Sequence, residues 1–204
     1  MKRAMIHTAV RRHVTRLSVM LLVAAGWLAC GTFEARAQGS KRSEYEVKAE
    51  YLPLFAQFVK WPAASFADTN APLVIGVLGD YPFGEALDQA VKNLSTVDGR
   101  KLIIQRSRNV ADVKSCHVLF ICKSEKDQLD QILASVAGGG GAVLTVGETE
   151  GFAARGGIIN LVLEENKVRF EINRDAATHG KLSIGSELLS LARIVATKNS
   201  REQK

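Results

Sequence analysis

Short apolar runs alternate with helical stretches along most of the chain. The runs are nearly continuous, as in parallel strands buried on both faces, and they lie at 73–78, 101–105, 118–121 and 142–146. Helical stretches lie between some of them, at 83–92 and 125–136. This alternation predicts an α/β fold, a three-layer sandwich with a mostly parallel central sheet.

A further helix is predicted before the first strand. Ser43 and Glu46 have the spacing of a capping box, in which each side chain bonds the other residue's backbone amide. Apolar residues follow at helical spacing and predict one buried stripe, formed by Val47, Tyr51, Leu54, Phe58 and Trp61. Pro62 is expected to end this helix. Pro53 lies inside it and predicts a kink, because an interior proline costs about 3 kcal/mol.

The pattern changes after Gly157. Residues 158–163 and 168–172 predict an antiparallel hairpin at the C-terminal side of the sheet, joined by a four-residue loop at 164–167. Asn173 is expected to cap a short helix that ends at Gly180. A last helix is predicted from the spacing of Ile184, Leu188, Leu191 and Val195.

The N-terminal residues 1–37 have the parts of a secretory signal peptide. Basic residues precede an apolar run at 17–29, which is shorter than the roughly 20 residues of a membrane-spanning helix. Ala35-Arg36-Ala37 then offers a cleavage site after Ala37. We expect an exported protein whose residues 38–204 form a single domain. Two alternatives stay open, an uncleaved anchor and a lipoprotein attached through Cys30.

The charge of the chain does not indicate a nucleic-acid partner. The full sequence has a formal net charge of +6, from 27 basic and 21 acidic residues. Residues 1–37 hold six of the basic residues and one of the acidic ones, so residues 38–204 have a net charge of +1. The excess of positive charge therefore belongs to the signal peptide, and no nucleic-acid binding is expected.

The candidate catalytic groups do not form a recognisable pair. Cys116 and His117 are neighbours in a strand, so their side chains should point to opposite faces. Cys116 and Cys122 lie at opposite ends of that strand, too far apart for a disulfide. His117 is expected in the core and His179 at the end of a helix. We predict no metal, no cofactor and no enzymatic activity, because no acid–base pair, triad or phosphate loop is present.

Several segments resemble, in order, the YfiR/HmsC-like family of small exported regulators. They are Tyr45–Ala49, Phe55–Pro62, Cys116–Ile121, Gly151-Phe152, Gly156–Leu161, Val168–Asn173 and Leu188–Arg193. The chain differs from the family's more usual pattern at Pro53-Leu54 and in most of the paired cysteines.

The resemblance implies a periplasmic protein that binds the periplasmic sensor domain of an inner-membrane diguanylate cyclase. Binding would repress the cyclase and lower cyclic-di-GMP and biofilm formation. The resemblance also implies an OmpA-like outer-membrane lipoprotein as a second partner, and the sequence leaves open whether the chain forms a homodimer. A periplasmic small-molecule receptor, with a pocket at the carboxyl ends of the strands, is the alternative function.

The predicted hairpin is our candidate partner-binding site. Strand 158–163 is apolar at nearly every position, so we expect one face to pack on the core and the other to expose apolar side chains. The residues assigned to the partner are Ile159, Leu161, Arg169 and Glu171. In the alternative arrangement the last helix covers that face.

Overall fold

The computed structural model describes residues 43–113 and 115–197, and the predicted signal peptide lies outside these residues. The helices are α2 (Glu44–Gln57), α3 (Ala86–Leu94), α4 (Val110–Val113), α5 (Leu129–Gly138), α6 (Arg174–His179) and α7 (Ser186–Leu191). The strands are β1 (Val59–Lys60), β2 (Leu73–Leu78), β3 (Thr96–Val97), β4 (Arg100–Ser107), β5 (Val118–Ile121), β6 (Leu144–Gly147), β7 (Ile159–Glu164), β8 (Lys167–Asn173), β9 (Ser183–Ile184) and β10 (Arg193–Val195).

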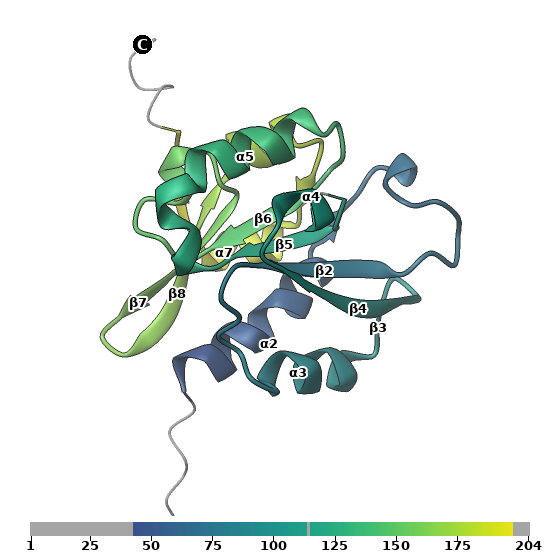
Figure 1. Cartoon of the computed structure of the whole chain (residues 1–204), viewed down its shortest axis with the longest axis horizontal. Helices are drawn as coiled ribbons and strands as arrows, with labels where there is room; N and C mark the ends of the chain where they lie inside the picture. Colours follow the sequence, from purple (N-terminus) through teal and green to yellow (C-terminus); the bar gives the residue numbers. More distant parts are fainter. Residues whose placement is uncertain (1–42, 114, 198–204) are drawn as a thin grey trace, which may run out of the picture. The chain divides into compact units, whose positions relative to one another are not determined.

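The central feature is an eight-stranded sheet in the order β10-β8-β7-β6-β5-β2-β4-β3. Its pairs are parallel except β7 with β8 and β3 with β4. Helices α2 and α3 cover one face, and α4 and α5 cover the other (Figure 1). The four strands predicted from apolar runs are β2, β4, β5 and β6, so the predicted mixed α/β sandwich is confirmed. No helix of the described residues is long and apolar enough to cross a membrane.

The two faces of β5 show how the core is divided. Val118 and Phe120 contact the helices on the α2 side, whereas Leu119 and Ile121 contact those on the α5 side. All four side chains are at most 1% exposed. Because both faces are buried, polar and apolar residues do not alternate along this strand. Burial on both faces also fits its place in the middle of the sheet.

Helix α2 begins as predicted but packs through a different face. Ser43 and Glu46 form the capping box, with the Ser43 hydroxyl accepting from the Glu46 amide at 3.2 Å. The predicted stripe is wrong at Leu54, which is 38% exposed, and the helix ends before Phe58. Its buried face consists of Lys48, Ala49, Leu52, Pro53, Phe55 and Ala56. The small alanines let the helix approach the sheet closely, and the helix continues through Pro53.

The predicted hairpin is tighter than expected, and the structure contains a second one. Glu164 pairs with Lys167, so the loop between β7 and β8 has two residues, Glu165 and Asn166, and not four. Both have positive φ, as a two-residue hairpin turn requires. The same kind of turn at Asp98-Gly99 joins β3 to β4, a hairpin that the sequence analysis missed although an Asp-Gly pair is typical of it.

The chain after Gly180 differs most from the prediction. Asn173 caps α6 as expected, accepting from the Ala176 amide at 2.9 Å. The predicted last helix is confirmed only over Ser186–Leu191, because the two ends of the predicted range belong to β9 and β10. Strand β10 pairs in parallel with β8 and becomes an edge of the sheet. Leu188 and Leu191 keep their helical spacing in α7, whereas hydrogen bonding to β8 takes Val195 into the sheet.

A buried ion pair joins α2 to the carboxyl end of β6. Lys48 and Glu148 have side chains only 3% and 4% exposed, and their charged atoms are 2.5 Å apart. Glu148 also accepts from the Lys123 amide at 3.2 Å, and the Tyr45 hydroxyl lies 3.4 Å from it. Lys48 contacts Glu44 as well, one turn earlier in the helix. The ion pair therefore fixes α2 to two strand ends, those of β5 and β6.

We expect Lys48→Met to destabilise the protein by about 3 kcal/mol or more, because it leaves Glu148 buried without its cation. The double variant Lys48→Met/Glu148→Gln should regain much of that loss, since the amide oxygen can still accept from Lys123. Urea denaturation measures both changes. Lys92→Met, at an exposed lysine of α3, is the control and should change stability by no more than about 0.5 kcal/mol. Equal losses in the single and double variants would contradict this account.

Candidate partner-binding surface

The crevice where open α/β sheets bind ligands is filled here by side chains. The strand order reverses between β2 and β5, so a ligand would be expected at their carboxyl ends. The Asp80 amide instead donates to the Ser124 hydroxyl at 3.0 Å, and that hydroxyl donates to Glu125 at 2.9 Å. A Cβ on Gly79, whose φ is +103°, would lie 2.4 Å from the Ser124 oxygen. This closed, acidic turn disfavours a bound phosphate.

His117 is a core residue, as predicted. Its Nδ1 accepts from the Val74 amide at 3.1 Å, and its Nε2 lies 3.0 Å from the Ser65 carbonyl, so Nε2 carries the proton. The ring stacks on Phe66 with 4.4 Å between centroids. Burial lowers the pKa of His117, and the nearby Arg100 charge lowers it further. Both ring nitrogens are thus used to join the chain around residue 65 to the sheet.

We expect the stability of the protein to fall as pH drops below about 6.5, the ordinary pKa of histidine. The folded state holds His117 neutral while the unfolded chain takes up a proton, so the stabilisation is present above that pH and is lost through the lower folded pKa. The urea concentration at the midpoint of unfolding should fall with decreasing pH, and it should fall less steeply in His117→Gln than in the wild type. Identical slopes in the two proteins would show that other groups cause the dependence.

The two cysteines are separate buried thiols, as predicted. Neither Cys116 nor Cys122 takes part in a disulfide in the described part of the chain. Burial raises the pKa of Cys116 to about 11, and burial together with nearby carboxylates raises that of Cys122 to about 12. Thiolate is the reactive form of cysteine, so these positions are poorly suited to nucleophilic chemistry.

The apolar face of the β7–β8 hairpin is directed into the core. Ile159 and Leu161 are 0% and 1% exposed, and they oppose Ile172 and Phe170 across the hairpin. Phe170 in turn packs on Phe55 of α2, with ring centroids 5.2 Å apart. The prediction that Ile159 and Leu161 form an exposed apolar patch is therefore wrong, because α2 covers the face to which they belong.

The opposite face of the hairpin is polar and ordered by an arginine from β10. Arg193 contacts Glu171 at 2.6 Å and Glu164 at 2.9 Å. The second carboxylate oxygen of Glu171 accepts from the side-chain amide of Asn160 at 2.8 Å. Glu171 is thus a structural anchor, with only 14% of its side chain exposed. Sequence analysis missed Arg193 because it placed that residue in a helix.

Arg169 takes no part in the network that joins Arg193 to Glu171 and Glu164. It lies on the polar face opposite Val162, is exposed, and makes no ion pair with any described residue. At the tip of the hairpin, Leu163 is 49% exposed. Figure 1 shows that the tip projects past the helices on both faces of the sheet. The hairpin therefore exposes two cations, Arg169 and Lys167, on the polar face that the Arg193 network orders, and the apolar Leu163 on the opposite face.

The chain belongs to the YfiR/HmsC-like family, whose model matches residues 45–193. This match confirms the resemblance found in the sequence. The family consists of periplasmic regulators of diguanylate cyclases. No curated protein matches the chain.

Two solved structures match this chain at low sequence identity. A conserved domain protein from Vibrio cholerae O1 biovar El Tor is 18% identical, with a TM-score of 0.48, and the match covers 76% of this chain and 60% of that one. A Streptococcus pneumoniae protein, described as an ABC domain in complex with L-Trp, is 10% identical, with a TM-score of 0.46 and coverages of 72% and 60%. The chain thus spans about 60% of each structure.

Proposed function

We propose that this protein represses an inner-membrane diguanylate cyclase by binding its periplasmic sensor domain, and so lowers cyclic-di-GMP and biofilm formation. The family match over residues 45–193 is the observation that carries this proposal. Export would follow cleavage after Ala37, which places the domain in the compartment of the sensor. An OmpA-like outer-membrane lipoprotein that sequesters the repressor stays part of the proposal.

The hairpin tip is the surface that we assign to the cyclase. Of the four residues assigned from sequence, Arg169 stays a contact, and Glu171 acts by holding Arg193 in place. Ile159 and Leu161 support the hairpin from the core, and Leu163 replaces them as the apolar anchor. A protein interface depends on a few such anchors, each worth about 2 kcal/mol or more.

Deleting the gene should raise cellular cyclic-di-GMP, and the rise should vanish when the partner cyclase is deleted too. In the complemented strain, Leu163→Asp and Arg169→Glu should each bring cyclic-di-GMP back toward the level of the deletion. A loss of about 2 kcal/mol corresponds to roughly 30-fold weaker binding. Both residues are exposed, so the melting temperatures should stay near that of the wild type.

Matched controls come from the other end of the sheet. Ile103→Asp and Lys101→Glu change an exposed apolar and an exposed basic residue of β4, and both variants should repress normally. Ile159→Asp should instead unfold the domain, because it puts a carboxylate into the core. If cyclic-di-GMP does not rise in the deletion strain, the proposed function is wrong. If Leu163→Asp and Arg169→Glu fold and repress normally, only the assigned surface is wrong.

A further inference from the structure

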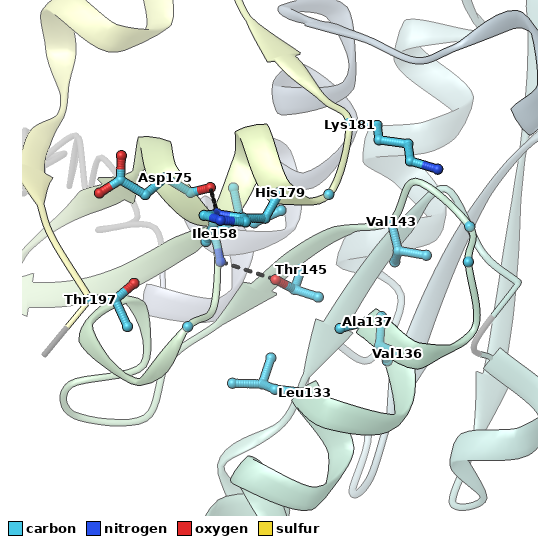
Figure 2. Close-up of a pocket in the computed structure, with 15 residues that line it drawn as sticks. Leu133, Val136, Ala137, Val143, Thr145, Ile158, Asp175, His179, Lys181 and Thr197 are labelled. Carbon is cyan, nitrogen blue, oxygen red and sulfur yellow. Dashed lines mark hydrogen bonds between the residues drawn. The ribbon is translucent and has the colours of Figure 1, made fainter. Parts of the chain in front are cut away.

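A cavity of about 430 Å³ lies between α5 and α6, away from the filled crevice and from the hairpin tip. Figure 2 shows α5 on one side of it, α6 on the other, and Thr145 between them. Its volume falls within the range of about 300 to 1,000 Å³ that is typical of small-molecule sites. Neither the hairpin surface nor the proposed contact with the cyclase uses this cavity.

The inner walls of the cavity are aliphatic. They are formed by buried residues of α5 and of the segments that flank β6 and precede β7, namely Leu133, Val136, Val143 and Ile158. These side chains are between 3% and 9% exposed. At the rim, Gly140 and Gly141 have no side chain to cover the opening, and Ala137 is exposed. An apolar ligand body could therefore enter from the rim and replace water against these walls.

Two hydroxyl groups in the lining have protons left to donate. The Thr145 oxygen accepts from the Ile158 amide at 3.0 Å, so its own proton is free for another acceptor. The Thr197 oxygen likewise accepts from the Asn173 side-chain amide at 2.8 Å. Thr145 is 5% exposed, so its hydroxyl lies where a ligand would exclude water. Both groups therefore suit a ligand that carries acceptor oxygens.

The charged groups at the rim favour a negative ligand. Lys181 lines the cavity and makes no ion pair with any described residue. The Nδ1 of His179 donates to the Asp175 carbonyl at 2.6 Å, so Nε2 of the neutral ring is an acceptor and gives a carboxylate no hydrogen bond. Asp175 is the one acidic residue in the lining, and Figure 2 shows its carboxylate directed away from Thr145 and Val143. Figure 2 shows the Lys181 side chain on the Val143 side of the cavity and the Asp175 side chain on the opposite side.

We infer that this cavity binds a small carboxylic acid with a compact apolar body. The body lies against the aliphatic walls, and the carboxylate accepts from the Thr145 hydroxyl and the Lys181 ammonium group. Hydrogen bonds that involve a charged partner are stronger than neutral ones, so the carboxylate should bind better than its amide. An amine of the same shape would meet donors and a like charge, and should bind worst.

The test compares three probes with one carbon skeleton: 4-phenylbutanoate, 4-phenylbutanamide and 4-phenylbutylamine. Each is titrated into the protein and followed by ligand-observed NMR and by the shift in melting temperature. We expect the carboxylate to bind, and the amide to bind about tenfold more weakly, as the loss of one charge-assisted hydrogen bond implies. The amine should show no binding at millimolar concentrations. Equal affinity for the amine and the carboxylate would overturn the assignment, as would no binding of any probe.

Variants locate the binding in the cavity. Ala137→Trp puts an indole into the opening and should abolish binding, whereas Ala134→Trp changes an exposed residue of the same helix outside the lining and should not. Lys181→Gln should weaken the carboxylate about tenfold and leave the amide unchanged, with Lys167→Gln at the hairpin turn as the control. Binding that survives in a folded Ala137→Trp protein would show that the probe binds elsewhere. None of these results depends on whether a cyclase is the partner.

Discussion

The buried ion pair between Lys48 and Glu148 is the interaction on which the arrangement of the domain depends. Two charges that are nearly inaccessible to water cost several kcal/mol each to bury, and they are tolerated only when each meets its partner. The pair sets the position of α2 against β5 and β6. Helix α2 then covers Phe170 and the apolar face of the hairpin. The surface that the hairpin presents to a partner is therefore set by a contact at the other end of the helix.

Local sequence patterns predicted those elements that depend on the conformational or hydrogen-bonding preference of the residues themselves. The capping box at Ser43 and Glu46, the cap at Asn173 and the apolar strands around Phe120 were found for this reason. Patterns failed where pairing partners distant in the sequence decide the structure. The helical spacing continues to Val195, yet residues 193–195 pair with β8 in the sheet. Lys48 and Glu148 are 100 positions apart, and nothing local indicates that they meet.

The candidate surface was predicted only in part, because its exposure also depends on an element distant in the sequence. Alternation along 168–172 correctly separated Arg169 and Glu171 from the apolar positions, because alternate residues of a strand face opposite ways. The sequence could not show which face α2 would cover, so Ile159 and Leu161 were placed outside when they are inside. The cavity between α5 and α6 was not foreseen at all. Its lining comes from segments that are separated in the sequence, and no local pattern shows that they meet.

The position of Arg193 has a consequence for how the protein could be inactivated. The core helices and all strands but β10 precede this residue, yet it supplies the cation for Glu171 and Glu164. A protease that cut the exposed segment around Leu191, which is 76% exposed, would leave α5 and α6 on either side of the cavity and remove only Thr197 from its lining. It would remove Arg193, whose ion pairs with Glu171 and Glu164 order the polar face of the hairpin. One cleavage could thus separate the two surfaces, leaving a folded domain whose hairpin has lost its order.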